Sequence, residues 1–117
     1  MKPLSNVELD GIEQGLHLKL PGLYRKLLVE LGHGVFNQGQ EIYHPSQVRG
    51  LYESFFDGPQ LFNPYFPFGC DNKKQEIWVI NAATEHAASI WHETVPEDWD
   101  DEEWLQYDLW VTRFLER

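Results

Sequence analysis

The sequence predicts an α+β fold, with a single domain over residues 1–117 and a largely antiparallel sheet flanked by helices. Two short apolar segments, 76–80 and 88–91, have the character of strands and follow each other too closely for a crossover helix. Apolar residues at helical spacing mark segments 21–31 and 101–115. The 117 residues, 42% of them hydrophobic, suit one domain with a sizeable core.

The first helix has a clear start signal near the N-terminus. Ser5 and Glu8 have the spacing of a capping box, in which each side chain bonds the backbone N–H of the other residue. Gly15 is expected to end this helix, because glycine is common where helices stop. The residues expected on its apolar face are Val7, Ile12 and Leu16.

A second helix is predicted to begin at Pro21, since proline is favoured at the first helical position. Gly32 or Gly34 is expected to end it. A segment with alternating leucines, Leu18 and Leu20, leads into this helix in an extended conformation. The residues that repeat at helical spacing inside it are Leu23, Tyr24, Leu27, Leu28 and Leu31.

The middle of the chain predicts a hairpin followed by a third helix. Short strands at 35–36 and 41–43 are separated by a polar turn at 37–40. Pro45 and Ser46 can open a helix, which the segment 57–59, Asp-Gly-Pro, then breaks. The residues expected on the apolar side of this helix are Val48, Leu51, Tyr52, Phe55 and Phe56.

The last third predicts a buried turn at 66–72, the strands at 76–80 and 88–91, and a C-terminal helix. Asp100 or Asp101 is expected to cap this helix, which reaches Leu115 and carries acidic residues in its first turn. Its broad apolar arc suggests that much of it is buried. The residues of that arc are Trp104, Tyr107, Trp110, Val111, Phe114 and Leu115.

Charge is distributed unevenly along the chain, which has a net charge of −10. Residues 1–74 hold 7 Lys and Arg against 8 Asp and Glu, whereas residues 75–117 hold 2 against 11. This sign argues against direct binding of nucleic acid or of an anionic membrane. It has two readings: a solvated surface that keeps the protein soluble, or a surface matched to a basic protein partner.

The sequence predicts a cytoplasmic protein. The N-terminal residues lack the apolar core of a signal peptide, and no apolar stretch approaches the ~20 residues of a membrane span. Cys70 is the only cysteine, so no disulfide forms within the chain, and a reducing compartment fits.

Three segments resemble signatures of the SUKH superfamily. The segment from Leu20 to Gly34 resembles its N-terminal signature, in which Leu-Pro opens a helix, an aromatic residue follows, and a glycine-containing turn leads to the sheet. The segment 68–71, Phe-Gly-Cys-Asp, resembles its Phe-Gly turn, and 77–81 stands where an aromatic strand follows. Members commonly carry an acidic-glycine pair after that turn, where this chain has Asn-Lys-Lys-Gln at 72–75.

The superfamily includes fungal cell-wall assembly regulators of the Knr/Smi type and bacterial immunity proteins that neutralise secreted toxins. The resemblance covers the chain from Ser5 to about Phe114. It implies a SUKH fold, a protein-binding function without catalytic residues or cofactors, and a nuclease or deaminase toxin domain as the partner. A regulatory scaffold without a toxin partner, as in the fungal relatives, is the alternative.

The dense acidic run at 97–103 is the predicted contact surface for a basic partner. Its carboxylates would stand in for the phosphates of a toxin's substrate, while Trp99 supplies apolar contact. Trp99 has a second reading, in which it docks onto the domain's own surface. The predicted contact residues are Glu97, Asp98, Trp99, Asp100, Asp101, Glu102 and Glu103.

Catalysis is the least favoured class. His86, His92 and Glu93 are the nearest approach to a metal site, but they lack the spacing of known zinc motifs, so a small metal-dependent hydrolase ranks last. Cys70 has no family motif of a nucleophile around it and is expected to be a small packed side chain.

The purified protein is expected to carry no stoichiometric zinc, iron or manganese, because no set of ligands in the sequence closes a site. Elemental analysis checks this. About one metal ion per chain, lost when His86 and His92 are changed to alanine, would contradict it and favour the hydrolase.

Overall fold

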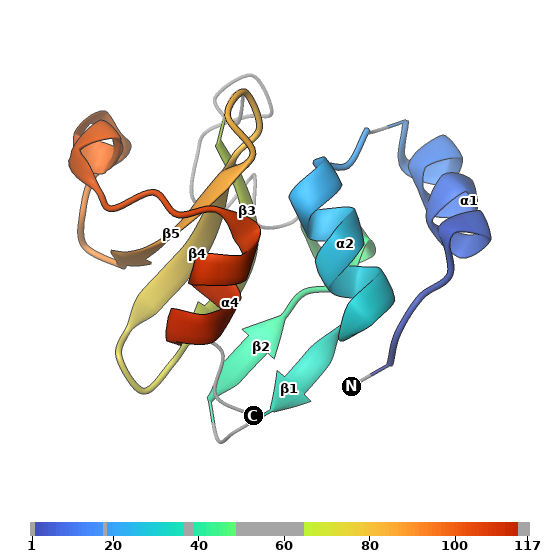
Figure 1. Ribbon diagram of the computed structural model, residues 1–117, viewed down its shortest axis with the longest axis horizontal. Helices are drawn as coiled ribbons and strands as arrows, with labels where there is room; N and C mark the ends of the chain where they lie inside the picture. Colours follow the sequence, from blue (N-terminus) through green and yellow to red (C-terminus); the bar gives the residue numbers. More distant parts are fainter. Residues whose placement is uncertain (1, 18, 37–38, 49–64, 115–117) are drawn as a thin grey trace.

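The computed structural model describes residues 2–17, 19–36, 39–48 and 65–114. Within these residues it has the predicted α+β architecture, with a five-stranded antiparallel sheet and helices packed around one hydrophobic core (Figure 1). Several sequence predictions fall outside the described residues, namely the turn at 37–38, the continuation of the third helix with Leu51, Tyr52, Phe55 and Phe56, its break at 57–59, and Leu115.

The strands follow one another across the sheet in the order β1-β2-β3-β4-β5, and every neighbouring pair is antiparallel. The predicted strands at 76–80 and 88–91 are confirmed as parts of β4 and β5, which are paired residue by residue. The bounds are β1 Gly34–Phe36, β2 Gln40–Ile42, β3 Tyr65–Asp71, β4 Glu76–Asn81 and β5 His86–Trp91.

Helix α1 spans Asn6–Leu16, and its capping box is confirmed: Ser5 Oγ accepts from Glu8 N, and Glu8 accepts from Ser5 N. Two details of the prediction are wrong. Gly15 lies inside the helix, which ends where His17 adopts a left-handed conformation with φ 52°. Val7 is 81% exposed, because Leu9 instead is the residue that the helix buries.

Helix α2 spans Gly22–Glu30, one residue after the predicted start, with Pro21 as its N-cap. The carboxylate of Glu85, in the turn between β4 and β5, accepts hydrogen bonds from Gly22 N and Leu23 N, each at 3.0 Å. A carboxylate at this position satisfies free N–H groups and complements the helix dipole. The buried face of α2 consists of Leu23, Tyr24, Leu27 and Leu28, as the spacing predicts.

The predicted turn at 66–72 is wrong, because residues up to Asp71 form the central strand β3, and the turn follows at 72–75. The pairing of β3 with β4 shifts register between Pro67 and Gly69, which marks a β-bulge. A Cβ atom on Gly69 would lie 2.8 Å from Trp78 Cε3 and 2.4 Å from the carbonyl oxygen of Glu41. The Phe-Gly pair therefore serves close packing inside the sheet.

Aromatic side chains fill the space between the sheet and the helices on one face. The centroid of the Trp78 ring lies 6.1 Å from that of Phe68 and 5.0 Å from that of Trp110 in helix α4 (Tyr107–Phe114). The centroids of Phe68 and Trp110 are 5.0 Å apart. Tyr24 of α2 contacts Phe68 at 6.3 Å, so both helices meet the same cluster. The four side chains are fully buried.

The C-terminal helix is much shorter than predicted. The acidic run lies in η2, a 3₁₀ helix at Pro96–Asp101, and α4 begins only at Tyr107 and spans Tyr107–Phe114. The residues between η2 and α4 were predicted to be helical from the spacing of their apolar side chains, but tertiary contacts hold them in another conformation. Leu105 is extended and exchanges two backbone hydrogen bonds of 2.8 Å with Ala87 at the outer edge of β5.

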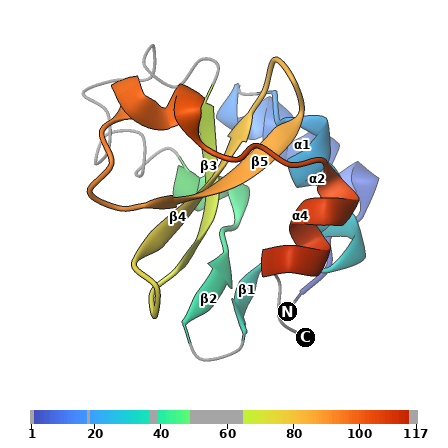
Figure 2. The ribbon, with the colours of Figure 1, turned by 60° about the vertical axis from the view of Figure 1, so that its left-hand side comes forward.

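The sheet is covered on both faces by this arrangement. Tyr65 lies on the face of β3 opposite the aromatic cluster, and its ring contacts Trp99 at 5.2 Å and Trp104 at 5.7 Å. Figure 2 shows the sheet between η2 on one side and α2 with α4 on the other. None of the helices that the structure describes combines the length and apolar character that a membrane crossing requires.

Substituting Gly69 with alanine is expected to lower the free energy of unfolding by about 1–3 kcal/mol, because the new methyl group meets backbone and an immobile indole. Gly11→Ala is the control. Its Cβ would meet nothing within 4 Å, and alanine is favoured in a helix by up to ~1 kcal/mol, so this variant should be more stable. Urea unfolding measures both, and unchanged stability of Gly69→Ala would contradict the packing argument.

Candidate protein-interaction surface

Trp99, predicted as an apolar contact for a partner, lies in the protein's own core. Its side chain is 2% exposed, it packs against Tyr65, and its Nε1 donates to the carbonyl of Thr94 at 3.0 Å. The docking reading of this residue is therefore correct, and the prediction that it contacts a partner is wrong. Its burial anchors the 3₁₀ helix that displays the acidic residues around it.

The carboxylates of the run point outward on either side of this anchor. Asp100 accepts a hydrogen bond from the Tyr65 hydroxyl, and burial together with this carboxylate raises the pKa of Tyr65 to about 12. Glu103 forms an ion pair with Arg113 of α4. These two contacts fix the segment at its middle and its end. Among the described residues, no hydrogen bond or ion pair engages the side chains of Glu97, Asp98 or Asp101, which are exposed.

Glu102 is crowded by other carboxylates. Partial burial raises the pKa of its carboxyl group, and the neighbouring charges of Glu76 and Asp101 raise it further. Glu76 comes from β4, so the acidic surface extends from η2 onto the sheet. Like charges held close together destabilise a fold, which makes this arrangement costly unless a positive group approaches it.

Trp91 is the exposed aromatic residue beside this acidic surface. It ends β5, is directly opposite Glu76 in the β4–β5 register, and is 51% exposed. Glu76 also accepts a hydrogen bond of 2.9 Å from Ser89 Oγ, which holds its carboxylate between the two strands. Directly opposed residues in a sheet lie about 5 Å apart at Cβ, so the Trp91 side chain lies beside that of Glu76.

The sequence analysis did not single out Trp91, which it placed only as the last residue of the apolar strand at 88–91. Trp91 shares its face of β5 with buried Ala87 and with Ser89, which is directly opposite buried Trp78, so strand alternation does not predict its exposure. Trp91 is exposed because it is the last residue of the strand. Of the two tryptophans Trp91 and Trp99, Trp91 is the exposed one and Trp99 the buried one.

The residues considered for metal binding do not converge. His86 and His92 lie at opposite ends of β5, where His86 is opposite Asn81 and His92 Nδ1 lies 3.1 Å from the carbonyl oxygen of Gln75. Glu93 lies 3.9 Å from His92 Nε2 at the surface. Within the described residues, no three His, Cys, Asp or Glu side chains are placed to share a metal ion.

Two histidines that are distant in sequence meet in the structure. The rings of His33 and His44 lie 4.9 Å apart with an edge-to-face orientation. His44 Nδ1 accepts from Ser46 N at 3.1 Å, and Gln47 Oε1 accepts from His44 N at 2.8 Å, at the start of helical residues 45–48. This geometry is a reciprocal helix cap and assigns His44 a structural role.

Cys70 is buried in β3, and its thiol lies 3.6 Å from Asn72 Oδ1. Burial raises the pKa of the thiol, which disfavours the thiolate that a nucleophile requires. The geometry of Cys70 is that of a packed side chain.

Comparisons with known proteins add no relative: no protein-family model matches the chain, and no curated protein matches it. The resemblance to the SUKH superfamily thus rests on the three sequence segments described above. Of these, the Leu-Pro segment forms α2 and leads into β1, and the aromatic strand is β4. The Phe-Gly segment is a bulged strand in this chain.

Replacing Glu102 with glutamine should stabilise the protein at pH 7. The pKa of Glu102 is higher in the folded than in the unfolded state, so the folded protein loses stability as rising pH ionises this group. The amide removes that loss, and the advantage over the native protein should vanish below about pH 4, where glutamic acids are protonated in both states. Urea unfolding at pH 7 and pH 4 measures the difference.

Glu97→Gln is the matched control, because Glu97 is an exposed carboxylate of the same run. It should change stability little at either pH. A destabilised Glu102→Gln variant at pH 7 would show that the carboxylates are not crowded as described.

Proposed function

We propose that this chain is a non-catalytic protein-binding module, which neutralises a basic toxin domain by covering it with the acidic surface. That surface consists of Glu97, Asp98, Asp101 and Glu102 around η2, together with Glu76 and Trp91 on the sheet. The resemblance to SUKH immunity proteins supports the class of partner, a nuclease or deaminase toxin. The mechanism is occlusion, with carboxylates placed where the toxin would hold the phosphates of its substrate.

The observation that carries the proposal is the fixed display of carboxylates on η2, where buried Trp99 anchors the segment and Glu97, Asp98 and Asp101 are exposed around it. Beside them, burial and then the charges of Glu76 and Asp101 raise the pKa of Glu102. Acidic residues that merely keep a protein soluble gain nothing from close approach. A basic partner would relieve the repulsion on binding, and this gain is absent in the free protein. Trp91 adds the large apolar contact that is typical of residues dominating interface energetics.

Charge complementarity would act mainly on the rate of association. Opposite charges steer two proteins together, and this steering weakens as salt shortens the range of the field to about 8 Å at physiological ionic strength. Binding should therefore weaken steeply with salt, whereas the contact made by Trp91 should respond little.

Neutralising three unpaired carboxylates, by Glu97→Gln, Asp98→Asn and Asp101→Asn, should weaken partner binding at least ~10-fold, chiefly through slower association. The partner is first captured from the native host and identified by mass spectrometry, and affinity is then measured by calorimetry at low and physiological salt. Because these side chains are exposed and unpaired among the described residues, the fold should be unaffected.

A matched control places lysines at Val7, Gly11 and Gln14 on the exposed surface of α1. Three lost negative charges in one variant and three added positive charges in the other change the net charge from −10 to −7 in both. The α1 variant should bind normally. Trp91→Ala should weaken binding by about 2 kcal/mol, or ~30-fold, with little effect on salt dependence. Full affinity of the neutralised variant for the captured partner would remove the acidic surface from the mechanism.

A further inference from the structure

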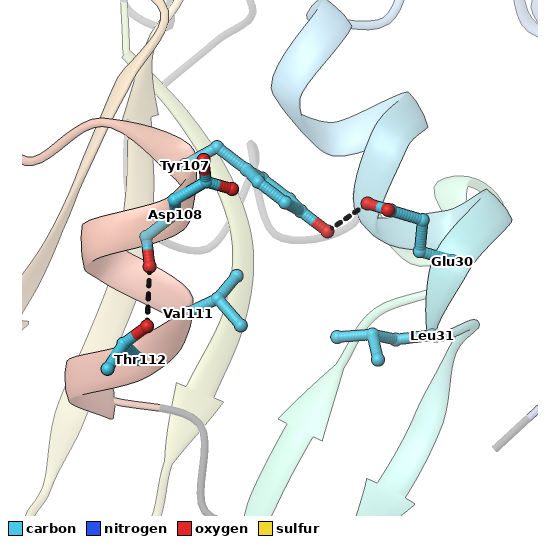
Figure 3. A pocket seen from close by; sticks show the side chains of 6 residues that line it. All are labelled: Glu30, Leu31, Tyr107, Asp108, Val111 and Thr112. Atoms are coloured by element: carbon cyan, nitrogen blue, oxygen red, sulfur yellow. Dashed lines mark hydrogen bonds between the residues drawn. The ribbon is translucent and has the colours of Figure 1, made fainter.

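A hollow of about 600 Å³ opens between the C-terminal end of α2 and helix α4 (Figure 3). It is separate from the run at 97–103, although α4 begins only a few residues after that run. Its lining combines apolar and acidic groups from both helices. The lining residues are Glu30, Leu31, Tyr107, Asp108, Val111 and Thr112.

The chemistry of the lining favours a cation on an apolar stem. Leu31 and Val111 supply aliphatic surface, whereas Glu30 and Asp108 are exposed carboxylates on opposite helices. The C-terminal end of α2 adds the negative pole of its dipole, and its last turn contains no basic residue. The lining itself contains no cationic residue, although the Lys26 ammonium lies beside Tyr107 at the rim.

Two contacts organise the rim of the hollow. The Tyr107 hydroxyl donates to Glu30 Oε2 at 2.5 Å, which holds the Glu30 carboxylate at the mouth. Lys26 Nζ lies 4.3 Å from the centroid of the Tyr107 ring, so this aromatic ring already attracts an ammonium group. Thr112 Oγ1 donates to the backbone carbonyl of Asp108 at 2.8 Å, and within the described residues no hydrogen bond or ion pair engages the Asp108 carboxylate.

We propose that the hollow is a binding site for an arginine or lysine side chain of the basic protein partner. The aliphatic stem would lie on Leu31 and Val111, and the charged end would meet Glu30 and Asp108. Long basic side chains bury their methylene groups while keeping the charge in a polar setting, which matches this lining. As a second contact of the same interface, this inference rests on the proposed function.

The two contact regions are connected through α4. Arg113 of α4 forms the ion pair with Glu103, and the extended segment at 102–106 leads from η2 into the helix. Figure 1 shows this segment and α4 in front of the sheet, with α2 to the right of α4. A basic partner lying along α4 would present side chains to both regions.

The hollow is tested without the partner by titrating the protein with N-acetyl-arginine methylamide and following the methyl resonances of Leu31 and Val111 by NMR. Saturable shifts at both residues are expected. The neutral isostere N-acetyl-citrulline methylamide, at the same ionic strength, should bind at least ~10-fold more weakly because its head group has no charge. Equal shifts from the two probes, or none at these methyl groups, would overturn the proposal.

Conservative variants test whether the carboxylates are responsible for binding of the arginine probe. Asp108→Asn and Glu30→Gln should each weaken binding of the arginine probe, and Glu30→Gln keeps an acceptor for the Tyr107 hydroxyl. Glu93→Gln, an exposed carboxylate outside both the hollow and the acidic surface, should leave probe binding unchanged. Unfolding curves confirm that all three variants are folded, and an unchanged probe affinity in both hollow variants would refute the site.

The two proposals can fail separately. If the arginine probe does not bind but the neutralised η2 variant loses the partner, the hollow is excluded and the proposed function stands. If the probe binds in the hollow but the η2 variant keeps full affinity for its partner, the acidic surface of the proposed function is excluded. If Asp108→Asn weakens both probe and partner binding, the side chain in the hollow comes from the partner.

Discussion

The close packing of Gly69 against Trp78 is the constraint on which the rest of the fold depends. The bulge in β3 places Phe68 beside Trp78, and only a residue without Cβ fits between the indole and the backbone of Glu41. Trp110 of α4 then packs on both rings. A helix that must dock on this face has to start after the chain has crossed the edge of β5.

That crossing explains the conformation of the acidic run. Trp99 is buried against Tyr65 on one face of the sheet, and Trp110 is buried on the other, so residues between them connect the two faces around β5. Leu105 pairs with Ala87 on the way and covers part of the strand edge, which would otherwise offer unpaired backbone groups. The carboxylates of the run are therefore displayed by a short helix and an extended segment rather than by one long helix.

The charges on this segment are balanced only in part. Tyr65 and Arg113 engage Asp100 and Glu103, which fixes the backbone at two points. Glu102 remains crowded by Glu76 and Asp101, and burial contributes to the raised pKa of its carboxyl group. Under the proposal of a basic partner, binding would relieve this repulsion, and little conformational freedom would be lost because the segment is already fixed.

The hollow between α2 and α4 is a second place on the surface where carboxylates are held on rigid elements. It depends on Trp110, which seats α4 on the aromatic cluster, and on Glu85, which caps α2 from the β4–β5 turn. Both helices are thereby fixed relative to the sheet, and the carboxylates of Glu30 and Asp108 are presented on rigid elements. Trp91 lies on the sheet itself, so each part of the proposed interface has a rigid support.

Local signals in the sequence were enough to determine much of the fold. The capping box at Ser5, the leucine spacing of α2 and the apolar runs of β4 and β5 depend on near neighbours, and all were correctly predicted. The antiparallel arrangement followed from the short connections between strands. The acidic character of the last third is a property of composition, so it was also available from the sequence.

Tertiary structure decided what depends on contacts between distant residues. The Phe68–Gly69 pair looks like a turn locally and becomes a bulge because Glu41 and Trp78 close around it. Trp99 is buried and Trp91 is exposed because burial depends on which parts of the sheet the rest of the chain covers. Glu30 and Asp108 line the same hollow from two helices, and no spacing along the chain encodes that arrangement.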